Sequence, residues 1–356
     1  MRICSALFSL SLKHLPACNR VLLQKYILYF RKKSRTIDFC FRLGYNYKSI
    51  SIFIMENTMS VYDEFSGVYT LLLTPFNEDR SIDYRAYEEY VSWQAAFRPQ
   101  HLFANCGSSE MTALTFEERI KCAGLAVKNS GGVPVFATGN LRSTHEEEIE
   151  EIKALENTGV SGLVFVTKGM CDRPEEQFEY LSELATHTEL PVILYEFPGM
   201  RPHLMEPEVY GRLAATGRFK GIKDTTSEIT EIEKKIVLQG SSNVLQANIP
   251  FLYDAYELGA RGVVATPTTC GADLFVKMWD EWVRGDKQAA KQTYYQIINL
   301  DNAIDSGFNA SAKYICRLRG VNMNWYTRGD HKLSSARMAS LKAYVEWAVS
   351  EGIFKS

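Results

Sequence analysis

Two short stretches of the sequence each end an apolar run on a side chain capable of covalent chemistry. These are Tyr195 in "LYEFPGM" (194–200) and Lys223 in "FKGIKDTT" (219–226). Burial disfavours the ammonium form of a lysine, and the free amine can attack a carbonyl carbon to form a Schiff base. A neighbouring phenol can move the protons that this reaction requires. Singly, the ordinary readings are a solvated lysine and a packed tyrosine ring; together, the two residues predict a nucleophile and its proton shuttle.

Short apolar runs alternate with amphipathic helical stretches from "GVYTLLLTPF" onward, as is typical of β-α units and a parallel sheet. One helical stretch, "THEEEIEEIKALENTG", has acids in its first turn and a closing glycine. Eight candidate strands can be counted, at 68–73, 101–104, 133–137, 162–166, 192–195, 221–223, 244–246 and 262–265. Eight such units predict an α/β fold of the TIM (β/α)8 barrel type. The carboxyl ends of neighbouring strands would then bring Tyr195 and Lys223 together.

The strand signals stop beyond about residue 285. Three helical patterns follow, over 287–304, 310–320 and 334–352. We therefore expect the barrel over 59–286 and a small C-terminal helical domain over 287–356.

Residues 1–58 read as an N-terminal extension that is not part of the fold. Ten of residues 1–54 are lysine or arginine, and only Asp38 is acidic. A basic, acid-poor segment is typical of an organelle transit peptide, but clustered tyrosine, phenylalanine, isoleucine and asparagine are not. The alternative, which we favour, is an upstream region read as protein, with Met55 or Met59 as the true start.

The composition indicates a globular protein that acts on a small molecule. The net charge of -2 gives no general attraction to nucleic acid or to an anionic membrane. No stretch is apolar over the length that a membrane span needs. The eight cysteines form no CxxC pair or disulfide framework, so we expect reduced thiols and a cytoplasmic location. The six histidines are scattered and do not cluster with carboxylates at strand ends, so we expect neither a metal nor a cofactor.

Several motifs resemble those of one enzyme family. They are "LLLTPF" (71–76), "CGSSEMTALTFEER" (106–119), "DRPEEQ" (172–177), "LYEFP" (194–198) and "GIKDT" (221–225). From about residue 66 onward, the chain is similar to the dihydrodipicolinate synthase and N-acetylneuraminate lyase family of pyruvate-type class I aldolases. The resemblance implies that Lys223 forms the Schiff base, that Tyr195 is the catalytic tyrosine, and that Thr225 and Val264 line the substrate pocket. It also implies a small-molecule 2-oxo acid substrate and a homo-oligomer, either a tetramer or a dimer.

Two departures from the family pattern concern the substrate pocket. The family usually has Gly-Ser/Thr-Thr-Gly-Glu in the second loop, whereas this chain has Gly-Ser-Ser-Glu at 107–110. Ser108 or Ser109 can still hold the carboxylate of a 2-oxo acid together with backbone amides. The alternative for this serine pair is a capped turn before the next helix. After Tyr195, the family's frequent asparagine is Glu196, which can bind a substrate hydroxyl or amine or can cap the next loop.

A third departure removes a proton relay. Many family members carry an aromatic pair before "RP", and its tyrosine completes a relay across subunits. This chain has Met170 and Cys171 instead, so that relay cannot operate in the same way.

Three functions are compatible with these residues. The first is a Schiff-base-forming lyase or aldolase that cleaves or forms a carbon–carbon bond of pyruvate or a related 2-oxo acid through Lys223. The second keeps this lysine chemistry but dehydrates a sugar-derived 2-oxo acid. The third is a non-catalytic ligand-binding homologue, which would have no need for a lysine of lowered pKa. We favour the first.

A chain that begins at Met59 is expected to match the longer chain in melting temperature and in Schiff-base formation. The reason is that the first expected strand starts downstream, at residue 68. Thermal melts of the two purified proteins provide the test. A shorter protein that is insoluble or markedly less stable would show that the extension packs on the barrel.

We expect inefficient condensation of pyruvate with aspartate semialdehyde, the reaction of dihydrodipicolinate synthases. Those synthases hold the carboxylate of the aldehyde with an arginine, and the ungapped position here is Met200. Arg201 lies one residue further on, where Pro202 restricts its backbone. A buried carboxylate that lacks its arginine loses several kcal/mol of binding free energy, and Glu196 would repel it further. A measured turnover near the enzyme median of about 10 s⁻¹ would contradict this expectation and assign the role to Arg201.

Overall fold

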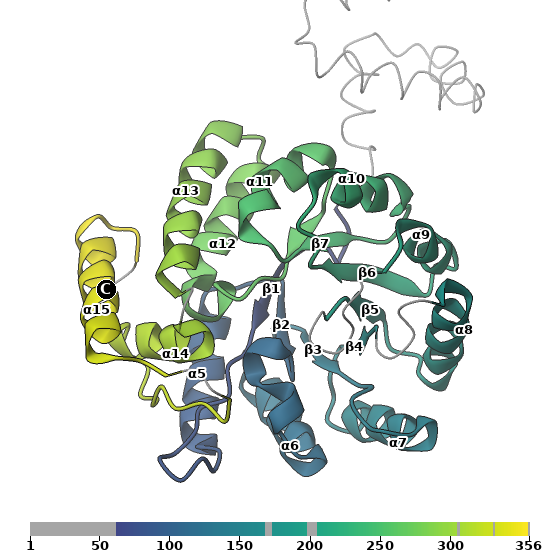
Figure 1. Ribbon diagram of the computed structural model, residues 1–356, viewed down its shortest axis with the longest axis horizontal. Coiled ribbons are helices and arrows are strands. Elements are labelled where there is room, and N and C mark those ends of the chain that lie inside the picture. The colour runs from purple at the N-terminus through teal and green to yellow at the C-terminus, as the bar shows by residue number, and fades with distance from the viewer. Residues whose placement is uncertain (1–61, 168–172, 198–204, 305–306, 330–331, 355–356) are drawn as a thin grey trace, which may run out of the picture. The chain divides into compact units, whose positions relative to one another are not determined.

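Eight parallel strands form a closed barrel surrounded by helices (Figure 1). The structure, a computed structural model, describes residues 62–167, 173–197, 205–304, 307–329 and 332–354. Each strand pairs with the next in chain order, and β8 pairs with β1 to close the ring. The strands are β1 Gly67–Leu71, β2 His101–Ala104, β3 Val135–Thr138, β4 Gly162–Val166, β5 Val192–Tyr195, β6 Phe219–Asp224, β7 Val244–Gln246 and β8 Gly262–Val263. The expected TIM barrel is confirmed.

The expected strands agree with the observed ones to within a few residues. The bounds of β2, β4, β5 and β7 are those expected. β3 begins at Val135 rather than at residue 133, and the intervening Pro134 has no N–H to donate to a strand ladder. β6 begins at Phe219, earlier than expected, and its pairing with β5 is irregular between Val192 and Ile193.

Helices follow each strand and continue beyond the barrel. The helices are α5 Tyr84–Ala96, η2 Gly107–Ser109, η3 Met111–Ala113, α6 Phe116–Asn129, α7 His145–Glu156, α8 Pro174–Leu184, η4 Ala185–His187, α9 Pro207–Ala215, α10 Ile229–Leu238, α11 Ile249–Leu258, α12 Thr268–Val283, α13 Lys287–Ile304, α14 Phe308–Leu318 and α15 Ser335–Ser350. Thr115 and Thr144 begin α6 and α7 with capping boxes, in which each threonine accepts a hydrogen bond from the backbone of a glutamate three residues later. These caps fix where the two helices start.

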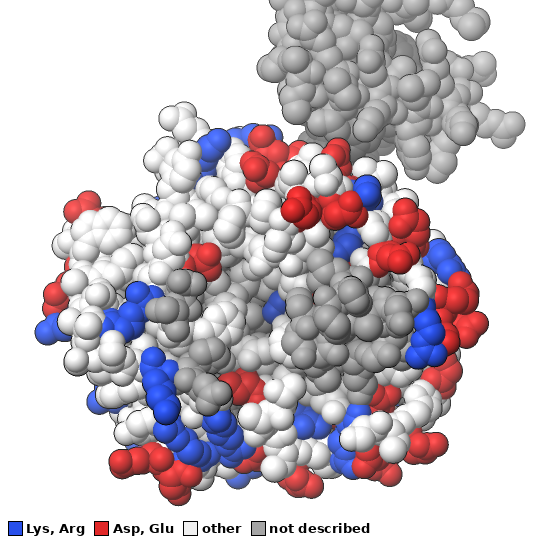
Figure 2. Space-filling model, viewed as in Figure 1, with Lys and Arg blue, Asp and Glu red and all other residues white. Residues whose placement is uncertain are grey.

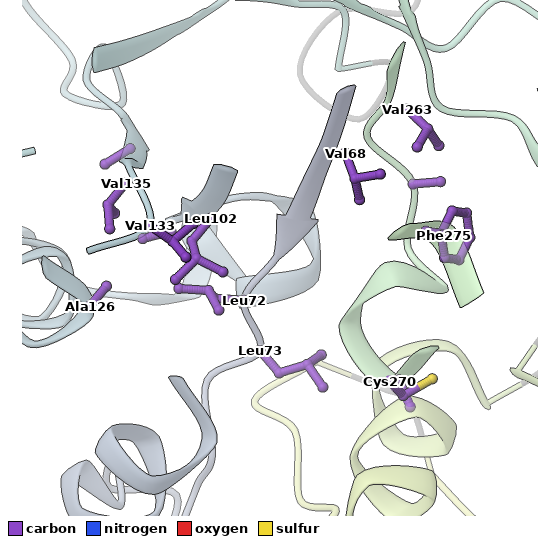
Figure 3. Packing of buried hydrophobic residues seen from close by; sticks show 14 of the residues in the cluster. Val68, Leu72, Leu73, Leu102, Ala126, Val133, Val135, Val263, Cys270 and Phe275 are labelled. Atoms are coloured by element: carbon purple, nitrogen blue, oxygen red, sulfur yellow. The ribbon is translucent and has the colours of Figure 1, made fainter. Parts of the chain in front are cut away.

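Two apolar layers stabilise the barrel. An outer layer fills the space between strands and helices; in Figure 3, Val68 of β1 and Val263 of β8 lie beside Phe275 of α12. An inner layer fills the barrel itself and includes Tyr69 and Phe103. Side chains of a strand alternate between these layers because successive residues point to opposite faces.

This alternation sets the direction of the two candidate catalytic side chains. Leu194 belongs to the outer layer, so the next residue, Tyr195, points into the barrel and belongs to the inner one. In the same way Ile222 packs in the outer layer, and Lys223 follows it. The residues that succeed Tyr195 and Lys223 must then point outward again.

The C-terminal helices pack against the last part of the barrel. α13 lies beside α12 and α11, and α15 packs on α14 and α13 (Figure 1). The division into domains 59–286 and 287–356 stays a prediction. The N-terminal extension and both candidate starts, Met55 and Met59, lie outside the described residues.

Charged side chains of both signs are interspersed around the rim of the face in Figure 2, with uncharged residues across much of its centre. The described residues of this face form no broad basic surface of the kind that binds nucleic acid. Among the described residues, no helix has the length and apolar character needed to cross a membrane.

Candidate active site

Lys223 and Tyr195 lie side by side inside the barrel. They are register partners at the ends of β6 and β5. The Lys223 Nζ lies 4.1 Å from the centroid of the Tyr195 ring and 5.9 Å from that of Phe103. Both residues are buried, with 5% of Lys223 and 3% of Tyr195 exposed. The two strand ends bring Tyr195 and Lys223 together as expected, and the amine lies close to two aromatic rings.

Burial changes the protonation of both groups. It lowers the pKa of Lys223 to about 8, and an electrostatic contribution from Cys106 opposes this only in part. The adjacent ring faces favour the ammonium ion, but contacts of this kind are worth about 2 kcal/mol when desolvated and do not reverse the effect of burial. Burial also raises the pKa of Tyr195, so its phenol stays protonated and can donate a proton. A fraction of free amine and a neutral phenol thus coexist near neutral pH.

Gly107 allows the loop after β2 to approach the phenol closely. A Cβ atom at this position would lie 3.0 Å from the Tyr195 hydroxyl oxygen and 3.3 Å from the Phe197 ring. A hydrogen bond from the Gly107 backbone to the phenol partly offsets the effect of burial on the pKa of Tyr195. Any side chain here would push the loop away from Tyr195.

The two serines of this loop have different surroundings. The Ser108 Oγ lies 3.3 Å from the Oγ1 of Thr266, which follows β8. The Ser109 hydroxyl instead donates to the Leu72 carbonyl and accepts a hydrogen bond of 3.0 Å from the Cys106 backbone. Ser109 thus holds the turn together, as its alternative interpretation anticipated. A substrate contact stays a prediction for both serines, and the geometry favours Ser108.

Thr225 and Val264 also lie near the strand ends. Thr225 follows β6, and its hydroxyl donates to the Glu196 carbonyl at 3.1 Å, which ties the ends of β6 and β5 together. Val264 packs in the inner layer with Tyr195, and its backbone N–H donates to the Gln246 carbonyl at 3.0 Å. Both positions are compatible with the expected pocket lining, which stays a prediction.

Glu196 lies in a buried charge cluster outside the barrel. It forms a short ion pair with Lys235 of α10, and Lys235 Nζ also lies 3.2 Å from Asp224 Oδ1 and 2.8 Å from Thr226 Oγ1. Glu196 and Asp224 immediately follow Tyr195 and Lys223, so strand alternation directs them toward α10. The expected role of Glu196 in binding a substrate hydroxyl or amine stays a prediction that this ion pair disfavours.

Lys235 is the cation that compensates the two buried carboxylates of this cluster. Burial alone would lower its pKa, but attraction to Glu196 and Asp224 outweighs burial and the pKa is raised. Lys235 therefore binds the outward side chains that directly follow Tyr195 on β5 and Lys223 on β6. Sequence reasoning missed it because "EIEKKI" reads as an ordinary amphipathic helix, with nothing to distinguish Lys235 from the exposed Lys234.

A second cluster fixes the other side of the site through Glu110. This residue follows Ser109 and adopts a left-handed conformation with φ of 60°. One of its carboxylate oxygens accepts a bond of 2.8 Å from Lys313 of α14, and the other accepts the backbone N–H groups of Arg328 and Gly329. The C-terminal part of the chain thus anchors the loop that carries both serines.

The predictions on Met170 and Cys171, and those on Met200 and Arg201, lie outside the described residues.

The comparisons with known proteins identify the family. The model of the "Dihydrodipicolinate synthetase family" matches residues 64–339. The 4-hydroxy-tetrahydrodipicolinate synthase of Thermodesulfovibrio yellowstonii is 28% identical over 246 residues, which cover 67% of this chain and 83% of that protein. The enzyme of the same name from Leptospira biflexa is 29% identical over 246 residues, covering 66% and 80%.

Solved structures show the same fold. YagE, a prophage protein of the dihydrodipicolinic acid synthase family from E. coli K12 solved in complex with pyruvate, has a TM-score of 0.73 at 21% identity and covers 80% of this chain and 98% of its own. The dihydrodipicolinate synthase of Aquifex aeolicus has a TM-score of 0.73 at 20% identity, with the same coverages.

We expect Lys235→Met to destabilise the protein strongly, because it leaves Glu196 and Asp224 buried without their cation. Removal of one partner of a buried ion pair costs about 3–5 kcal/mol, which for a domain of this size lowers the melting temperature by on the order of 10 °C. The matched control is Lys234→Met, the exposed neighbour on the same helix, which should melt close to the parent. Equal melting temperatures for the two variants would show that the cluster contributes little.

Proposed function

Because the chain belongs to the dihydrodipicolinate synthetase family, we propose that it is a Schiff-base-forming lyase or aldolase in which Lys223 condenses with pyruvate or a related 2-oxo acid. The observation that carries the proposal is the buried amine of Lys223, with its pKa lowered to about 8 and its Nζ 4.1 Å from the Tyr195 ring centroid. A purely ligand-binding homologue would have no use for this combination. The amine is therefore the group on which the chemistry depends.

The first half of the reaction forms the covalent intermediate. The free amine of Lys223 attacks the carbonyl carbon of the 2-oxo acid, and the carbonyl oxygen becomes a hydroxyl. Tyr195 delivers the proton with which this hydroxyl leaves as water, and a protonated imine remains. The Ser108 hydroxyl, near Thr266 at the end of the barrel, can hold the carboxylate of the acid.

The second half uses the imine as an electron sink. In the cleavage direction, the hydroxyl on the fourth carbon gives up its proton to the Tyr195 phenolate as the bond between the third and fourth carbons breaks. The electron pair of that bond moves onto the third carbon and is delocalised into the imine as an enamine. Protonation of the enamine and hydrolysis then release the 2-oxo acid and restore Lys223. Condensation is the same sequence in reverse.

The identity of the second substrate, which reacts with the 2-oxo acid, is a separate part of the proposal. The relatives named 4-hydroxy-tetrahydrodipicolinate synthase carry that reaction in their names, whereas the substitution at Met200 leads us to expect that this chain performs it poorly. A hydroxylated or neutral partner would suit the site better. A cytoplasmic location and a dimeric or tetrameric assembly stay predictions.

The proposal predicts that pyruvate and borohydride add a reduced adduct to Lys223. The rate of adduct formation should rise with pH up to about 8 and then level off, because the attacking amine is free only above the pKa of Lys223. Intact mass and peptide mapping measure the adduct. Lys313 is an internal control, because burial also lowers its pKa to about 8 while Glu110 and the Tyr326 carbonyl bind its amine.

Two variants separate the roles of the pair. Lys223→Ala should abolish the adduct, and an undiminished adduct or one mapped to Lys313 would overturn the assignment. Tyr195→Phe removes only the phenolic oxygen, so it should keep slow adduct formation and lose turnover by about 10²-fold or more. Turnover equal to that of the parent would remove Tyr195 from the mechanism.

A further inference from the structure

Two histidines and a glutamate lie close together on the protein surface, on α7, α8 and η4. His145 is the first residue of α7, Glu183 lies in the last turn of α8, and His187 ends η4. His145 Nε2 lies 2.8 Å from one Glu183 carboxylate oxygen, and His187 Nε2 lies 2.7 Å from the other. One candidate donor atom from each of the three residues lies within 4.8 Å of the others. The sequence had suggested scattered histidines, but in the fold these two lie side by side, one on α7 and the other on η4.

The surroundings of His145 suit a metal ligand. While Nε2 faces Glu183, Nδ1 lies 3.8 Å from a carboxylate oxygen of Glu148, a buried residue that also accepts a hydrogen bond from the Tyr180 hydroxyl. A neutral imidazole has a single N–H and can serve only one of these two carboxylates. With a metal ion on Nε2, the Nδ1–H would be directed at Glu148. Metal-binding histidines commonly have such a carboxylate behind them, where it fixes the tautomer and the ring orientation.

Two carboxylates, those of Glu183 and Glu148, face His145, and one cation, Lys153, lies nearby, where its amine donates to the His187 backbone carbonyl at 2.6 Å. Glu183 lies at the C-terminal end of α8, where the helix dipole favours positive charge and disfavours a carboxylate. The centroids of the two histidine rings lie 5.8 Å apart, and the angle between the ring planes is 73°. The three side chains are 40%, 50% and 31% exposed in the order His145, Glu183 and His187, which leaves room for water to complete a coordination shell.

We propose that His145, Glu183 and His187 form a binding site for a divalent transition metal ion, with Zn²⁺ as the best match. Two imidazole nitrogens and one carboxylate oxygen are a ligand set that zinc accepts in tetrahedral geometry, with a fourth position for water. Tetrahedral bonds of about 2.0–2.1 Å place ligand atoms roughly 3.3 Å apart. The two contacts with Glu183, at 2.7 and 2.8 Å, would have to open to that spacing, and the widest donor separation, up to 4.8 Å, would have to close. A bound ion would crosslink α7 to the end of α8 and would not touch Lys223.

The test is calorimetric titration of the untagged full chain, stripped with chelator, with ZnCl₂ near neutral pH. We expect one equivalent of Zn²⁺ to bind at this site and to weaken at acidic pH, because protonated histidine cannot bind a metal. Mg²⁺ should not compete, because it prefers an all-oxygen shell. Co²⁺ should give visible d–d absorption when it binds.

Matched variants locate the ion. His145→Ala, His187→Ala and Glu183→Gln should each weaken this equivalent by about tenfold or more and reduce the Co²⁺ signal. Glu179→Gln removes the same charge one turn earlier on α8, from an exposed position, and should bind like the parent. Circular dichroism in chelator checks that each variant is folded. An absence of Zn²⁺ binding, or binding that both histidine variants retain in full, would overturn the proposal and leave three ordinary surface ion pairs.

Discussion

The enclosure of one amine by aromatic rings is the constraint on which the site depends. An ammonium ion inside an apolar barrel has lost its water, and no described carboxylate lies inside with it to compensate, because Asp224 and Glu196 point outward to Lys235. The pKa of Lys223 is consequently lowered. The same strand alternation that places the Lys223 amine inside the barrel directs Glu196 and Asp224 outward, so the buried amine and the buried ion pairs follow from one geometric rule.

Two charge clusters hold the opposite sides of the pocket. Lys235 joins the ends of β5 and β6 from outside the barrel, next to the candidate pair Tyr195 and Lys223. Glu110 ties the loop after β2 to the C-terminal helices through Lys313. Buried ion pairs of this kind contribute little net stability compared with apolar packing, but removal of one partner is severe. Glu196 directly follows Tyr195, and Glu110 directly follows Ser109, so the two clusters can fix the positions of these candidate site residues.

The fold could be predicted closely from the sequence, because buried parallel strands read as short apolar runs between helical patterns. Membership of the family and lyase chemistry at the level of that family are confirmed. The pairing of Tyr195 with Lys223 followed from counting strands. The direction of Glu196 was also within reach, since it follows an inward-facing residue. Lys235 was not, because its partners are distant in sequence and an amphipathic helix does not reveal which of its lysines meets a buried acid.

The link from Glu110 to the C-terminal helices has a consequence for the order in which the protein matures during synthesis. All eight strands are complete by residue 263, yet the cation that meets Glu110 is residue 313, and the two amides that complete its shell belong to residues 328 and 329. A nascent chain from which only the barrel has emerged therefore has an acid that must stay hydrated, and the loop bearing Ser108 lacks its contacts with the C-terminal part of the chain. The contacts that fix this loop are therefore made only after residues 313–329 have been synthesised, so the loop takes its final position after the strands of the barrel are complete.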